Sequence, residues 1–153
     1  MSSLTIEKKM STSISSLDRS IQLSMEWLKE IGEELGWPDE ERVYSATKAV
    51  LNALRDRLPI GEAVEFAAQL PMLLKGIYYD SYDTGGKPLK IREREEFYEL
   101  VRDNFGRDPL NPRDPIIAVL KVYREKTGTG EFEDIKNVMP EELRGFFVAA
   151  EKD

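Results

Sequence analysis

The chain contains neither histidine nor cysteine. Without histidine, it cannot build a Ser-His-Asp triad, a Cys-His pair or the usual proton shuttle of neutral pH. Zinc, copper, haem and iron–sulfur sites lose their ordinary ligands, so only oxygen-binding ions such as Mg²⁺ or Ca²⁺ remain plausible. We therefore expect no cofactor and a non-enzymatic role. Because disulfides are also excluded, we expect a cytoplasmic protein stabilised by core packing alone.

Long apolar segments are missing as well. No stretch approaches the ~18 consecutive apolar residues of a membrane-spanning helix, so we expect a soluble chain without membrane contact. The Ser/Thr-rich segment 1–16 lacks the apolar core and cleavage site of a secretory signal, and we predict that it is a disordered tail. The net charge of −7 opposes attraction to phosphate backbones, so nucleic acid is not an expected partner.

The most informative pattern is an internal similarity. The segment VLNALRDRLPIGEAVEFAAQLPMLLKGIY, which begins at Val50, aligns without a gap with VLKVYREKTGTGEFEDIKNVMPEELRGFF, which begins at Val119. Because helix stops and prolines match along with apolar positions, we predict a tandem duplication of one helical unit. The identical pairs are Val50/Val119, Leu51/Leu120, Arg55/Arg124, Gly61/Gly130, Glu62/Glu131, Pro71/Pro140, Leu74/Leu143 and Gly76/Gly145.

Helical periodicity extends through both copies. Each copy predicts four helices, whereas no useful stretch alternates with the period of a strand, so we predict an all-α bundle. The first unit covers 17–80, a short loop covers 81–91, and the second unit covers 92–150, packed together as one compact domain. The first helix ends at Gly36 and has one apolar face. This face is formed by Leu17, Ile21, Met25, Leu28, Ile31 and Leu35.

The candidate site is an aromatic and acidic stretch at the boundary between the units. It contains three tyrosines within five residues, and tyrosine combines a rigid apolar ring with a polar tip that suits recognition. The alternative is that the tyrosines pack the units together while the aspartates face water. The candidate ligand- or partner-binding residues are Tyr78, Tyr79, Asp80, Tyr82, Asp83 and Arg92.

Two other functions remain open for this region. Convergence of Asp80, Asp83, the tyrosines and Arg92 would allow a small-ligand or Mg²⁺-dependent activity. A regulator that contacts nucleic acid could instead use the basic run containing Lys87, Lys90, Arg92 and Arg94. Because glutamates interleave with this run, a solvated helix start with local ion pairs is the simpler interpretation.

The sequence also resembles a known family. The run LRDRLPIGEAVEFAAQLPMLLKGIYYDSYD, followed by KP, IREREEF and VMPEELRG, is similar to the bacterial domain of unknown function 2267 family. The resemblance spans Met25 to Phe147 and implies an all-helical tandem unit, but it brings no activity, cofactor or catalytic residue. Ser81-Tyr82 departs from the Gly-Trp-like pair expected in relatives. We therefore favour a protein-interaction module that binds an unknown protein partner or self-associates, with Tyr78, Tyr79 and Tyr82 near the groove between the units.

Overall fold

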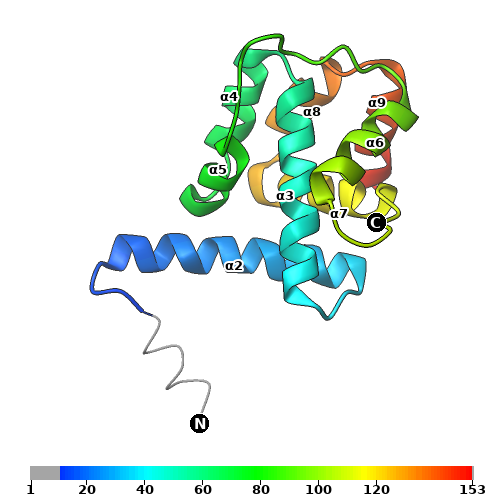
Figure 1. Cartoon of the computed structure of the whole chain (residues 1–153). Coiled ribbons are helices and arrows are strands. Elements are labelled where there is room, and N and C mark those ends of the chain that lie inside the picture. The colour runs from blue at the N-terminus through cyan, green and yellow to red at the C-terminus, as the bar shows by residue number, and fades with distance from the viewer. Residues whose placement is uncertain (1–10, 153) are drawn as a thin grey trace.

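The computed structural model describes residues 11–152. These residues form eight α-helices without a β-strand, which confirms the prediction of an all-α fold. Most of the predicted tail falls on residues 1–10, outside the described residues, and its last part is already helical from Ser15. The helices are α2 (Ser15–Leu35), α3 (Glu40–Arg57), α4 (Ile60–Ala68), α5 (Met72–Tyr79), α6 (Arg94–Phe105), α7 (Arg113–Thr127), α8 (Thr129–Asn137) and α9 (Glu141–Ala150) (Figure 1).

Glycine and proline set most of the helix boundaries. Gly36 and Gly106 follow α2 and α6 with φ angles of 69° and 59°, the left-handed conformation that ends a helix without a steric penalty. Pro59, Pro71 and Pro140 immediately precede α4, α5 and α9. Proline is tolerated at a helix start because the backbone donor that it lacks would have no helical partner there.

A stack of aromatic rings lies at the centre of the core. The ring of Phe66 on α4 stacks on Tyr123 of α7 at 4.0 Å between centroids and on Tyr78 of α5 at 5.4 Å. The buried hydroxyls are satisfied by backbone, since Tyr78 donates to the Ala63 carbonyl at 2.8 Å and Tyr123 donates to the Phe66 carbonyl at 3.1 Å. The stack therefore joins the consecutive helices α4 and α5 to α7, which comes from the second half of the chain.

The two halves of the chain are interleaved. α3, in the first half, packs most closely against α6, and α2 packs closely against α7. Figure 1 shows α3 standing at the centre, with α6 and α9 on one side and α4 and α5 on the other. Buried side chains before and after the loop at 81–91 form one continuous core. A pair of separate lobes is therefore not the arrangement of this chain.

α2 departs from the packing that its sequence pattern suggests. All of its buried side chains come from Ser24 onward. Leu17, Ile21 and Met25 of the predicted apolar face remain 43%, 41% and 49% exposed. The N-terminal end of α2 extends past α5 (Figure 1), and nearer its middle Ser20 accepts a hydrogen bond from the Leu73 backbone of α5 at 3.3 Å. None of the described helices is both long and apolar enough to cross a membrane.

Candidate functional site

The first tyrosine of the predicted site, Tyr78, is a core residue. Its side chain is fully buried against Phe66, and burial raises the pKa of its hydroxyl. Because the hydroxyl already donates to the Ala63 carbonyl, it has neither the exposure nor the free proton that ligand binding would use. For Tyr78, the structure supports the packing interpretation.

Arg55 on α3 organises the segment that follows Tyr78. Its Nη1 donates to the carbonyl oxygens of Tyr78 at 2.9 Å and Asp80 at 2.8 Å, at the C-terminal end of α5. Its Nε and Nη2 donate to the Asp56 carboxylate at 2.8 and 3.1 Å, and its guanidinium lies 5.1 Å from the centre of the Tyr82 ring. A positive charge is favourable at a helix C-terminus. Arg55 is only 6% exposed, so it acts as a buried anchor for α5.

Tyr79 and Tyr82 lie partly buried beside this anchor. Their ring centroids are 6.2 Å apart, and both side chains pack against the core. Ser81 between them has a φ angle of 63°, which reverses the chain after α5 and would suit glycine better. The Tyr82 hydroxyl is buried without a hydrogen-bond partner among the described residues, and burial, then the Asp56 charge, raises its pKa.

The polar members of the predicted site have separate partners. The Asp80 carboxylate lies 3.4 Å from the Lys48 ammonium, whereas Asp83 accepts a hydrogen bond from the Gly85 backbone at 2.9 Å. Arg92 is exposed, and its charge adds to burial in lowering the pKa of Arg57. Within residues 11–152, no three acidic side chains gather as a metal site would require. A role of Asp80, Asp83 and Arg92 in binding one ligand stays a prediction.

The basic run is divided by acidic residues. Lys90, Arg92 and Arg94 are exposed, but Glu93 and Glu95 are exposed among them. The side chain of Glu93 caps the first turn of α6, where an acidic group also complements the helix dipole. This segment therefore has the features of a helix start in water, without the continuous positive surface that a phosphate backbone would require.

A second candidate surface was not singled out from the sequence. We call it the α2 face; it gathers most of the large exposed apolar side chains of the described chain. Large contiguous apolar patches are rare on the surfaces of small proteins, and where they occur they often mark binding sites. The α2 face consists of Ile14, Leu17, Ile21 and Met25 with Tyr44 of α3 and Met72 and Leu73 of α5.

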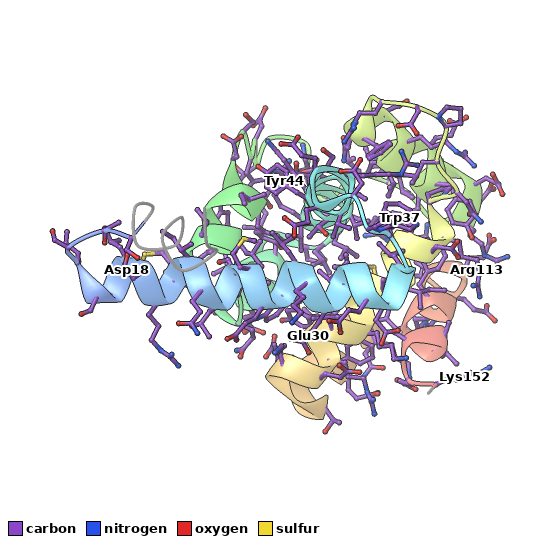
Figure 2. The ribbon with its side chains drawn as sticks, turned by 90° about the horizontal axis from the view of Figure 1, so that it is seen from below. Asp18, Glu30, Trp37, Tyr44, Arg113 and Lys152 are labelled. Atoms are coloured by element: carbon purple, nitrogen blue, oxygen red, sulfur yellow. The ribbon has the colours of Figure 1, made fainter. Side chains whose placement is uncertain are left out.

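Two surface cavities lie along the α2 face and meet at Tyr44. A cavity of about 470 Å³ lies between α2, α3 and α5 and is lined by Ile21 and Met72. A cavity of about 770 Å³ lies between α2 and the start of α3 and is lined by Met25 and Trp37. Figure 2 views this side of the molecule, with α2 across the front and Tyr44 and Trp37 beside it. The α2 face is therefore a hollowed apolar surface of the size that a docked side chain or helix occupies.

Charged side chains lie along α2 next to its apolar residues. Arg19, Glu26 and Lys29 are exposed, and Asp18 is partly exposed. Asp18 uses one carboxylate oxygen to accept the Thr12 backbone N–H at 2.7 Å. These four charges alternate in sign, whereas the last turns of α2 carry only the acidic Glu30, Glu33 and Glu34. Such alternation can determine which helix pairs with α2 and in which direction.

Comparisons with known proteins give a family but no activity. No curated protein matches the chain. The sequence profile of a family described as "Uncharacterized conserved protein (DUF2267)" matches residues 24–146, from the middle of α2 to α9. Leu17 and Ile21 of the α2 face precede the matched region. The match covers most of the chain and agrees with the resemblance from Met25 to Phe147, and the chain therefore belongs to the DUF2267 family.

Proposed function

We propose that the protein is a non-enzymatic protein-interaction module and that the α2 face is its binding surface. The observation that carries this proposal is the exposure of seven large apolar side chains on one side of the molecule, from 39% for Tyr44 to 69% for Met72. Burial of apolar surface is the main favourable contribution to protein association. A partner that covers this face would also support the part of α2 before Ser24, where no side chain is buried.

In this proposal the aromatic stretch is a support and the α2 face is the contact surface. Arg55 holds the C-terminal end of α5 through the carbonyls of Tyr78 and Asp80. The N-terminal end of the same helix carries Met72 and Leu73 into the α2 face. Fixing α5 at one end therefore keeps its exposed apolar residues in place at the other end. This arrangement lowers the ordering cost of binding because the surface is formed in advance.

The tandem duplication belongs to the same proposal. Its structural support is the equivalent order of helices on either side of the 81–91 loop and the reciprocal packing of α3 with α6 and of α2 with α7. Duplication followed by reciprocal packing would place the two copies around a pseudo-twofold axis. α2 has 21 residues whereas α6, at the equivalent position, has 12, so the extended part of α2 belongs to one copy only.

Photo-crosslinking tests whether the α2 face contacts protein. A photoreactive phenylalanine analogue replaces Tyr44 at the centre of the face, and in a control variant it replaces Val64 on α4. Val64 is a suitable control because it is apolar and 51% exposed but lies outside the α2 face. We expect defined protein adducts in cells from position 44 that exceed those from position 64. Equal or absent adducts at the two positions would contradict the proposed function.

A further inference from the structure

The apolar residues of α2 form a continuous stripe. Ile14 precedes the helix, and Leu17, Ile21 and Met25 follow at spacings of three and four residues, which places them along one side of it. Each is between 41% and 52% exposed. Figure 2 shows α2 lying across the front of the molecule along its whole length, with Tyr44 of α3 beside it. The stripe has the geometry of a helix–helix contact.

Asp18 and Lys29 lie on the same flank of this stripe. At 100° per residue their directions differ by only about 20°, whereas Arg19 and Glu26 point about 140–160° away from Ile21, to the side of α2 opposite the stripe. When two identical helices pack antiparallel about a twofold axis, each flank faces the same flank of the other helix. The charges on this one flank therefore decide whether two copies of α2 attract or repel each other.

We infer that the α2 face binds the α2 face of a second copy of this chain, with the two α2 helices antiparallel. In the register that places Ile21 against Met25 of the second copy, Asp18 of each copy lies beside Lys29 of the other. The twofold axis repeats this pair. In a parallel pairing about a twofold axis, each flank would instead face the opposite flank of the other helix, so Asp18 would not lie beside Lys29. Charge complementarity thus selects the antiparallel arrangement.

This inference rests on the proposed function and names the partner. A foreign amphipathic helix could also cover the stripe, but it would have to carry its own charges complementary to Asp18 and Lys29. A second copy of this chain already carries them. The self-complementary pattern on one flank is the property expected of an isologous contact, in which the same surface is used twice. The two surface cavities beside Tyr44 would then receive side chains from the second copy.

Charge reversal gives a test with a specific signature. Asp18→Lys makes both residues of the pair positive, and Lys29→Asp makes both negative, so each variant repels its own copies. We expect about tenfold weaker self-association for each variant alone in sedimentation equilibrium. Mixing the two variants pairs opposite charges at both sites, and we expect heterodimers to form with the affinity of the wild-type protein. Ile21→Glu should abolish association of the wild-type chain.

Circular dichroism of each variant checks that its helix content is unchanged. Because Asp18 also accepts the Thr12 backbone N–H, Lys29→Asp is the variant that leaves that bond in place. Arg19→Glu, on the side of α2 away from the stripe, is a control that should associate like the wild-type protein. Dimers that persist unchanged in the Asp18, Lys29 and Ile21 variants would overturn the inference. A wild-type protein that stays monomeric while position 44 crosslinks to a different protein would overturn it too, but would leave the proposed function standing. A monomer without crosslinks would refute both.

Discussion

Replacement of Arg55 by alanine tests how α5 is held in place. Arg55 donates to two carbonyl oxygens at the end of α5, and hydrogen bonds from a charged donor are worth roughly 1.5–3 kcal/mol each. The substitution also leaves the largely buried Asp56 carboxylate without its cation at 2.8 Å. Breaking a buried pair in this way typically costs roughly 3–5 kcal/mol. We expect a loss of this size in the free energy of unfolding, out of the roughly 5–15 kcal/mol of an ordinary domain.

The aligned arginine of the second half provides the control. Arg124 is partly exposed, and its guanidinium lies 6.0 Å from the centre of the Phe132 ring. Such a contact is worth about 0.5–1 kcal/mol, so Arg124→Ala should lower the stability far less than Arg55→Ala. Urea unfolding followed by far-ultraviolet circular dichroism measures both. Equal losses in the two variants would refute the conclusion that Arg55 is the anchor of α5.

Three smaller changes test separate parts of the structure, each by thermal unfolding. Tyr78→Phe removes the buried hydrogen bond to the Ala63 carbonyl and should lower stability by about 1 kcal/mol; an unchanged melting temperature would contradict this contact. Ser81→Gly relieves a left-handed backbone position and should stabilise the fold by about 0.5–1 kcal/mol, whereas a destabilised variant would show that the side chain contributes more than the strain. Burial, followed by nearby carboxylates, raises the pKa of Glu131. The folded state therefore binds the carboxyl proton of Glu131 more tightly than the unfolded state, and stability falls as the pH rises through the range in which this carboxyl group titrates. Glu131→Gln should therefore raise the melting temperature at neutral pH, and this gain should shrink in acid; a gain independent of pH would argue against the titration.

Local signals were sufficient to predict the helices. Glycine and proline fix where helices end or begin, as Gly36 and Pro59 show, because their effect on the backbone does not depend on distant contacts. The family resemblance rested on a long run of residues and is confirmed by the match to 24–146. The interleaving of the two halves was not predictable in this way, because it depends on which apolar faces meet after the helices have formed.

The surface of α2 shows why the candidate site was harder to predict. Its sequence has an apolar face containing Leu17 and Ile21, but a periodic pattern does not say whether another helix covers that face. The helix instead buries the side on which Trp27 lies. A helix much longer than its counterpart in the repeat was a signal that part of it would extend beyond the core. The partners of Arg55 were similarly hidden, because the carbonyls of Tyr78 and Asp80 to which it donates are distant in sequence.

The sequence left two interpretations of the aromatic stretch open: it could contact a ligand or partner, or it could pack the two units of the chain together. Packing describes Tyr78, which is fully buried. A role in binding for the exposed or partly exposed residues of this stretch stays a prediction, and the pairing of Asp80 with Lys48 places it at the border of the cavity between α2, α3 and α5. The residue types in a stretch indicate which interactions it could make. The hydrogen bonds and packing of those residues in the fold determine whether they are available to make them.

Distances between spin labels on α2 test the central claim most directly. The absence of cysteine from the chain allows single labels at Gln22, Glu26 and Glu33, which are all exposed on α2. In the antiparallel pair, the separation along the helix axis grows by about 3 Å for each residue from the twofold axis, twice the helical rise. We predict the shortest distance between copies at Gln22, a longer one at Glu26 and the longest at Glu33, about 30 Å along the axis. Equal distances at the three positions, or no dipolar coupling between copies, would contradict the account.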